Sequence, residues 1–328
     1  MSDYPKYVHI SEEGPREGFQ IEKGPISTDD KIRLINSLSN TGLKHIQICS
    51  FVNPKRVPGM ADAAAVADGI IVNPKVEYSA LWFNERGLEQ AMAFQHLSVD
   101  LKITLYASEH FLISNLNRDF KQHIEKTRAL IKFCLKKNVP ITRAGINAAF
   151  GCNFEGDVSS KNLVQAVDST LSLAQEFELN IESFSLADSM AWATPLSIKR
   201  GVGAVKDKYP DMPIRLHLHN TRGMGIANAY AGLEMGVDRF DSSIAGLGGC
   251  PFAKHQGAAG NVSTEDLAFM CSEMDIETGL DLDALIEASN VATKVVGHDT
   301  PACVAKGGSL AAIRQRLDVT PYGDKPNA

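Results

Sequence analysis

Short strand-like segments alternate with longer helical ones along most of this 328-residue chain. The alternation gives eight pairs, because each apolar segment of strand length is followed by a segment with helical periodicity. Strands that alternate with helices in this way form parallel sheets. Eight pairs without a proline- or serine-rich linker favour a single closed (β/α)8 barrel of the α/β class over an open, doubly wound sheet.

The positions of these segments follow from apolar periodicity and turn residues. We expect strands at residues 7–10, 45–49, 76–82, 101–107, 140–148, 181–187, 213–219 and 238–244. We expect helices between them at 31–39, 61–69, 84–96, 115–138, 160–177, 195–207 and 222–235, and two more at 264–274 and 282–294. The expected domain is residues 1–328, with the barrel over about 7–262 and extra C-terminal helices over about 263–315.

Composition limits the kinds of partner. The net charge of −6 argues against a nucleic-acid surface, although a local basic cluster can still hold a small anion. Six cysteines without a CxxC pair indicate reduced thiols. The N-terminal residues lack the profile of a signal peptide, and no apolar run reaches membrane-spanning length. We therefore expect a cytoplasmic protein without a membrane partner.

Two histidines stand one residue apart near the end of the expected strand at 213–219. Alternate side chains of a strand share a face, so His217 and His219 point the same way and present two neutral nitrogens to a divalent metal. A bare His-x-His pair is more often two half-buried histidines than a metal site. The metal interpretation gains from the next expected strand, which ends in the glycine-rich run 246–251 with Cys250.

The first expected strand leads into residues 11–20, a charged, glycine-containing stretch that we expect to be a loop. Arg16 and Glu17 lie there between glycines. An acidic, solvated turn is one interpretation of this stretch. The other is a functional one, because a (β/α)8 barrel keeps its catalytic residues at the carboxyl ends of its strands.

Several motifs occur in one order, each at an expected strand end. They are Arg16-Glu17, Ser50 to Pro58, His217-x-His219, Asp241-Ser242-Ser243, Gly246 to Ala253 and Gly260 to Asp266. Together they resemble 3-hydroxy-3-methylglutaryl-CoA lyase, a metal-dependent lyase with a TIM-barrel fold, over residues from about 8 to about 300. The glycine-cysteine-proline loop followed by Gly-Asn-x-x-Thr-Glu-Asp is the specific part, since related aldolases and synthases share His-x-His.

The resemblance implies a carbon-carbon lyase that cleaves a 3-hydroxyacyl-CoA, 3-hydroxy-3-methylglutaryl-CoA, into acetyl-CoA and acetoacetate. Such a cleavage needs removal of the hydroxyl proton, stabilisation of an enolate and return of a proton to carbon. A bound cation eases the first step by stabilising the alkoxide. The implied partners are a CoA thioester and further copies of the chain in a homo-oligomer, and the implied cofactor is a divalent cation, magnesium or manganese.

The resemblance also assigns residues. The implied metal ligands are Glu17, His217, His219 and Asn261, and the implied catalytic residues are Arg16, Glu17, His217 and Cys250. The arginine steadies the enolate oxygen, and the cysteine delivers the proton from a mobile loop. Residues expected to line the substrate and CoA site are Gln47, Asn84, Ser108, Asp188 and Glu265.

Three departures from the family pattern fall around the expected substrate. The family has aspartate at the position of Glu17 and glutamate at the position of Gln47. The segment between Cys250 and Asn261 is longer than is usual by two residues. The reaction class is therefore more firmly predicted than the acyl group.

Alternative functions stay open at this point. One is the same cleavage of a different 3-hydroxyacyl-CoA, such as a malyl-type thioester. Another is a synthase that runs in the bond-forming direction, although such enzymes normally carry additional C-terminal domains. A third is a barrel that binds CoA or a metal without turnover, against which stands the retention of Arg16, Cys250 and both histidines.

Overall fold

The computed structural model describes residues 4–22, 24–249 and 260–320. Nine strands form one sheet: β1 His9–Glu12, β2 His45–Phe51, β3 Glu77–Trp82, β4 Leu97–Ser98, β5 Lys102–Tyr106, β6 Arg143–Asn147, β9 Ser183–Ala187, β10 Ile214–His217 and β11 Arg239–Ser242. Two short strands, β7 Gly151–Cys152 and β8 Gly156–Asp157, pair separately. Every pairing within the large sheet is parallel, as the alternation predicted.

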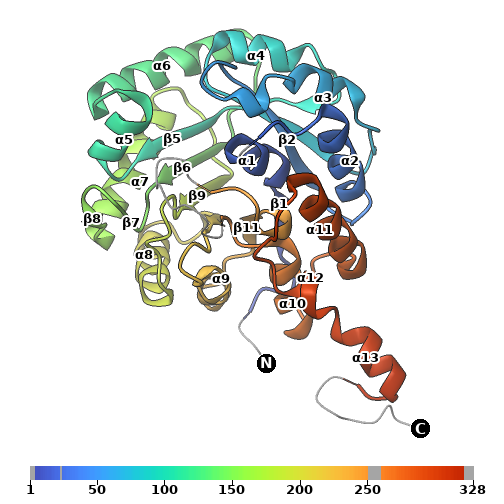
Figure 1. Ribbon diagram of the computed structural model, residues 1–328. Helices are drawn as coiled ribbons and strands as arrows, with labels where there is room; N and C mark the ends of the chain where they lie inside the picture. The colour runs from blue at the N-terminus through green and yellow to red at the C-terminus, as the bar shows by residue number, and fades with distance from the viewer. Residues whose placement is uncertain (1–3, 23, 250–259, 321–328) are drawn as a thin grey trace.

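The sheet curls into a barrel with helices around it (Figure 1). Its strand order is β4-β3-β2-β1-β11-β10-β9-β6-β5, so the two end strands are consecutive in the chain. Residues 97–106 contact β3 through β4 and β6 through β5, with only residues 99–101 between the two short strands. This stretch closes the ring in the place of the fourth strand, and the predicted TIM barrel is confirmed.

Most of the helices cover the outside of the ring. They are α1 Gly14–Ile21, α2 Thr28–Leu38, α3 Ala63–Gly69, α4 Glu85–Met92, α5 Glu109–Leu116, α6 Phe120–Lys136, α7 Ser160–Gln175, α8 Pro195–Lys208, α9 Gly225–Glu234, α10 Thr264–Glu273, α11 Leu282–Val296, α12 Val304–Gly307 and α13 Leu310–Leu317. Two 3-10 turns occur at Pro58–Met60 (η1) and Ile244–Gly246 (η2). Within the described part of the chain no helix is long and apolar enough to cross a membrane.

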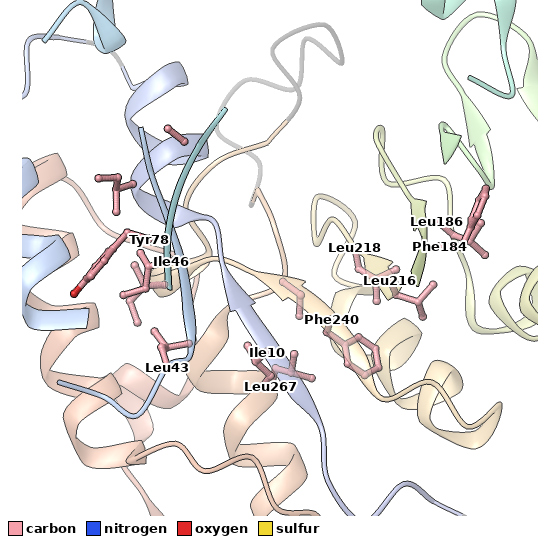
Figure 2. Packing of buried hydrophobic residues seen from close by; sticks show 14 of the residues in the cluster. Ile10, Leu43, Ile46, Tyr78, Phe184, Leu186, Leu216, Leu218, Phe240 and Leu267 are labelled. Atoms are coloured by element: carbon pink, nitrogen blue, oxygen red, sulfur yellow. The ribbon is translucent and has the colours of Figure 1, made fainter. Parts of the chain in front are cut away.

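The hydrophobic core lies between the sheet and the helices. Figure 2 shows part of this layer, to which the strands contribute Ile10, Ile46, Tyr78, Phe184, Leu186, Leu216 and Phe240. Side chains alternate along a strand, so the neighbours of these residues face the inside of the barrel. The inward set is polar and includes Ser11, Gln47, Ser79, Arg143, Ser185, Arg215, His217 and Asp241. The side chains that face the inside of the barrel are therefore available for a polar site, whereas those that face the helices form the hydrophobic core.

Two sequence predictions of secondary structure are wrong. Residues 11–20 are not a loop: β1 continues to Glu12, and α1 begins at Gly14 with Pro15 in its first turn, where the missing N–H of proline costs nothing. The helix expected at 115–138 begins too early: it corresponds to α6, which starts at Phe120, and the preceding α5 was not predicted. Asn117 ends α5 in a left-handed conformation (φ 54°), and Asp119 begins α6 with a capping box to Gln122.

The helices expected after the last barrel strand are present. Helix α10 begins at Thr264 and α11 packs against both α10 and α2, beside the barrel. Two further short helices, α12 and α13, follow them and were not predicted. Helix α13 extends away from the barrel in Figure 1.

Candidate active site

Glu17, His217 and His219 meet at the carboxyl ends of β1 and β10. Glu17 lies in the first turn of α1, and the histidines lie at the end of β10 and just beyond it. Their potential ligand atoms are all within 4.8 Å of one another. The two imidazole Nε2 atoms are 3.3 Å apart, and Glu17 Oε1 is 3.7 Å from His217 Nε2. The structure thus brings three of the four predicted ligands into one cluster.

Asn261 completes this cluster from another segment. Its backbone forms an antiparallel bridge with His219, and its Nδ2 donates to Glu17 Oε2 at 2.6 Å. Its carbonyl Oδ1 is buried and has no hydrogen-bond partner among the described residues. A buried acceptor without a donor is costly unless something else binds it. One carboxylate, two imidazoles and one amide oxygen fit a divalent cation, so these four residues could hold one.

Gly248 allows the segment before Cys250 to approach the cluster closely. Its φ of +90° favours glycine, and a Cβ at this position would lie only 2.7 Å from the Cβ of Glu17. Any larger residue would push against the carboxylate. Cys250 itself, with residues 251–259, lies outside the described residues, so its predicted role stays a prediction.

The charges of the cluster are coupled through short contacts. Burial would raise the pKa of Glu17, but the charges of Arg16 and the two histidines outweigh burial and lower the pKa to about 2. Burial lowers the pKa of His217, yet the Glu17 and Asp241 carboxylates outweigh it and raise that pKa. Glu17 is therefore ionised at neutral pH, as a metal ligand must be.

Asp241 supports the cluster from the next strand. Its Oδ2 is 3.3 Å from His217 Nδ1, which leaves the Nε2 of that ring facing the other ligands. Its Oδ1 accepts from Arg215 Nη1 at 2.9 Å, and the same guanidinium nitrogen donates to Ser11 at 2.7 Å. From the sequence, Asp241 was noted only as part of a family motif, and Arg215 was not expected at the site.

Arg16 lies beside the ligands and is held by three groups. Its Nη1 is 2.7 Å from Glu17 Oε1, its Nε donates to Gln47 Oε1, and its Nη2 donates to Glu13 Oε2. Burial would lower the pKa of this guanidinium, but Glu17 and Glu13 outweigh burial and raise it. Arg16 and Gln47 were both predicted at the site, whereas the sequence analysis passed over Glu13.

Asp188 is buried behind His217. Its backbone N–H donates to the carbonyl of His217 at 2.8 Å, and its Oδ1 accepts from the N–H groups of Trp192 and Ala193 at 2.7 and 2.9 Å. Its Oδ2 has no hydrogen-bond partner among the described residues. Burial raises the pKa of Asp188 to about 7, so this carboxyl group can change protonation near neutral pH.

Glu265 and Glu12 are fully buried carboxyl groups that connect segments around η2. Glu265 accepts from the N–H of Ala245 at 3.1 Å, and burial raises its pKa to about 8. Glu12, which the sequence analysis did not single out, accepts from Gly14, Ile244 and Thr264 at 2.6 to 2.9 Å. Burial raises the pKa of Glu12 to about 7. Both carboxyl groups thus join η2 to neighbouring segments.

Asn84 and Ser108 are helix caps. The exposed Asn84 accepts from the N–H of Gly87 at 2.9 Å at the start of α4. The buried Ser108 accepts from the N–H of Phe111 at 3.1 Å at the start of α5, and the Cys152 thiol donates to it. Their predicted contact with substrate stays a prediction.

A comparison with known families matches residues 7–292 to the family described as HMGL-like. The chain belongs to this family. Among curated relatives of this HMGL-like chain, hydroxymethylglutaryl-CoA lyase YngG of Bacillus subtilis is 38% identical over 298 residues, covering 91% of the chain and 96% of the relative. The 3-hydroxy-3-isohexenylglutaryl-CoA/hydroxy-methylglutaryl-CoA lyase of Pseudomonas aeruginosa is 37% identical over 303 residues, or 92% of the chain and 97% of the relative.

Solved structures of the same kind superpose closely on this HMGL-like fold. The HMG-CoA lyase of B. subtilis gives a TM-score of 0.84 at 36% identity, covering 94% of this chain and 99% of that one. The HMG-CoA lyase of A. baumannii, in complex with coenzyme A and 3-methylmalate, gives 0.82 at 36% identity, covering 94% and 97%. The comparisons confirm the resemblance inferred from the motifs and the enzyme class, a carbon-carbon lyase.

Proposed function

We propose that this protein cleaves 3-hydroxy-3-methylglutaryl-CoA to acetyl-CoA and acetoacetate. The observation that carries the proposal is the buried cluster of Glu17, His217, His219 and Asn261 with Arg16 beside it. Relatives named as lyases of this thioester align along nearly the whole chain, which supports the same substrate. We propose that residues 1–328 act as one domain, with a CoA thioester bound at the carboxyl ends of the strands.

The residues of the chain divide the chemistry among them. Glu17, His217, His219 and Asn261 would hold a divalent cation, which would supply positive charge beside the C3 oxygen of the substrate. Arg16, permanently charged and held on three sides, faces the developing enolate oxygen. Cys250 returns a proton to the enolate carbon. In these assignments each positive group, the cation or Arg16, lies beside an oxygen that becomes negative during the cleavage.

We propose magnesium or manganese as the cation, because the described residues of the cluster offer carboxylate and amide oxygen and imidazole nitrogen as ligands. We also propose a cytoplasmic homo-oligomer. The net charge and the reduced thiols expected from the sequence support this location.

The acyl group is the finer part of the proposal. Glu17 carries one methylene more than aspartate, which moves its carboxylate further from α1, and Gln47 presents a neutral amide to Arg16. Both changes border the substrate, so a malyl-type 3-hydroxyacyl-CoA is the second candidate. The Pseudomonas relative, named for two branched thioesters, supports variation of the acyl group within the family.

A substrate comparison tests this proposal. The purified protein would be stripped of metal and reloaded with magnesium or manganese. It would then be incubated separately with 3-hydroxy-3-methylglutaryl-CoA and with a malyl-type thioester, and the products would be identified by mass spectrometry. We expect acetyl-CoA and acetoacetate from 3-hydroxy-3-methylglutaryl-CoA only in the reloaded protein. Faster cleavage of the malyl-type thioester would move the assignment to the second substrate. Absence of turnover on both, with metal bound, would leave a binding protein.

A further inference from the structure

The starting point is the set of groups that hold Arg16. A guanidinium has five N–H donors in a rigid plane, so contacts on different edges fix both its position and its orientation. In this protein the three contacts are made by Gln47, Glu13 and Glu17. Gln47 is neutral and contributes a hydrogen bond without charge. Glu17 shares its carboxylate with Asn261 and the two histidines.

Glu13 differs from the other two residues that hold Arg16, Gln47 and Glu17. Among the described residues that contact Arg16, it is the one carboxylate outside the cluster of predicted metal ligands. Its side chain is 11% exposed, so the charge is largely removed from water. A buried carboxylate is stable only when it is paired or hydrogen-bonded, and the partner here is the Arg16 guanidinium.

The position of Glu13 gives a second, independent observation. Glu13 is the N-cap of α1, a position where the side chains of aspartate, asparagine, serine or threonine commonly accept a hydrogen bond from the first turn of the helix. Its side chain makes no such bond and instead reaches Arg16 three residues ahead. The backbone carbonyl of Glu13 accepts from the N–H groups of Arg16 and Glu17 at 3.1 and 2.8 Å. One residue therefore fixes both the backbone and the side chain of Arg16.

We propose that Glu13 is a positioning residue, which keeps the Arg16 guanidinium aimed at the reacting carbonyl of the substrate through a carboxylate that no metal ligand shares. The inference rests on the proposed lyase function for the role of Arg16. A divalent cation beside Glu17 would draw that carboxylate toward itself and repel the guanidinium. Glu13 then offsets the repulsion, so Arg16 stays in place when the cluster is loaded.

Moving the negative charge tests this inference. Glu13→Gln keeps the shape but removes the charge, and kcat should fall about 10- to 100-fold, the scale expected when a reacting group is displaced by about 1 Å. KM and the affinity for manganese should change less. The double variant Glu13→Gln, Gln47→Glu restores a carboxylate on the Nε edge of Arg16, where Gln47 Oε1 now accepts. Most of the lost kcat should return.

Controls separate this role from a structural one. Glu176→Gln removes a carboxylate from an arginine fork at the surface, with Arg128 at 2.7 and 2.8 Å, and should leave kcat unchanged. Wild-type kcat in Glu13→Gln, or a double variant no better than the single one, would overturn the proposal. Crystal structures of the wild type, the single variant and the double variant give a readout that does not depend on turnover. The Arg16 guanidinium should move away from the side chain at position 47 in the single variant and keep that contact in the other two proteins. An unmoved Arg16 refutes the proposal, whereas an inactive wild type refutes the lyase function alone.

Discussion

The two faces of the barrel sheet differ in what they bury. On the outer face, side chains such as Phe240 and Leu216 are completely buried against helices. On the inner face, their immediate neighbours Asp241 and His217 hydrogen-bond each other and lead to the metal-ligand cluster. Because alternate residues share a face, a register shift by one residue would exchange the two sets. Alternate residues of the same strands therefore contribute to the hydrophobic core and to the candidate active site.

The consecutive residues Glu12 and Glu13 show this contrast in one pair of identical side chains. Glu12 faces outward and accepts only neutral donors, and burial raises its pKa to about 7. Glu13 faces the inside and pairs with the charged Arg16. The surroundings, more than the residue type, decide what a buried carboxyl group does. The following predictions test whether substitutions on the inner face mainly affect catalysis and those on the outer face mainly affect stability.

The largest expected effect is at the inner face. His219→Ala removes an imidazole from the cluster and should abolish both metal binding and turnover, while the protein stays folded. Titration with manganese and a thioester assay measure this. The matched control is His9→Ala, at the exposed start of β1 at the opposite end of the barrel, which should leave both unchanged. Full metal affinity and rate in His219→Ala would contradict the ligand assignment.

The second prediction concerns Cys250, the predicted proton donor, which lies outside the described residues. Cys250→Ser should preserve metal binding and thermal stability but lower kcat by ~10²-fold or more, the scale of losing a general acid or base. Cys303→Ser, at an exposed cysteine, serves as the control. A serine variant with wild-type kcat would show that another group delivers the proton, and His255 would be examined next.

The outer face should respond in the opposite way. Phe240→Ala removes a fully buried ring and should lower the free energy of unfolding by about 3–5 kcal/mol, with kcat per folded molecule unchanged. Urea unfolding followed by active-site titration checks this. Phe83→Ala, whose side chain is 60% exposed, should cost far less. A stable Phe240→Ala protein with a damaged kcat would break the separation of the two faces.

A smaller effect is expected from Glu17→Asp, which shortens the ligand stem by one methylene. The carboxylate would retreat from Asn261, so kcat or the preference between thioesters should change by roughly 10-fold, while the melting temperature changes little. Steady-state kinetics on both thioesters, beside thermal melting, measure the two effects. A large loss of stability with unchanged kinetics would make Glu17 a structural residue.

The last prediction concerns the dependence of stability on pH that Glu265 contributes. Its folded pKa of about 8 lies above the ordinary value of 4.5, so the folded protein holds a proton that the unfolded chain releases. Stability from this group is complete below pH 4.5 and is lost as the pH rises toward 8. Glu265→Gln should flatten the curve of unfolding free energy against pH in that window. An unchanged slope in urea titrations at several pH values would mean that Glu265 is already ionised.

Local pattern in the sequence predicts the barrel, whereas the resemblance of its motifs to the lyase family assigns the metal-ligand cluster. Strand–helix alternation fixes the topology, and motifs at strand ends converge once the ring closes. Periodicity could not find α1, because Gly14 and Pro15 resemble a turn until the packing around Glu12 is known. The end of α5 depends on the left-handed conformation of Asn117, and the sequence around Asn117 is polar and gives no clear helix boundary.

The missed site residues have a different cause. Glu13 and Arg215 act through contacts on other elements, and Arg215 reaches Ser11 and Asp241 across two neighbouring strands. Nothing in the local sequence distinguishes such residues from ordinary surface charges. Asn84 and Ser108 show the reverse case, since each follows a strand and was predicted to line the site, and each side chain caps the helix that follows it. Long-range pairing is the information that one sequence lacks.

The backbone bridge between His219 and Asn261 has a consequence for how this active site can vary. Asn220 N–H donates to the Gly260 carbonyl at 2.7 Å, and Val262 N–H donates to the Leu218 carbonyl at 2.9 Å. These bonds clamp the two ligand-bearing segments together downstream of residues 250–259. Insertions or deletions upstream of the clamp change the length of that segment without altering the spacing of the ligands. A change of length between Cys250 and Gly260 would therefore leave His219 and Asn261 joined by the same backbone bonds.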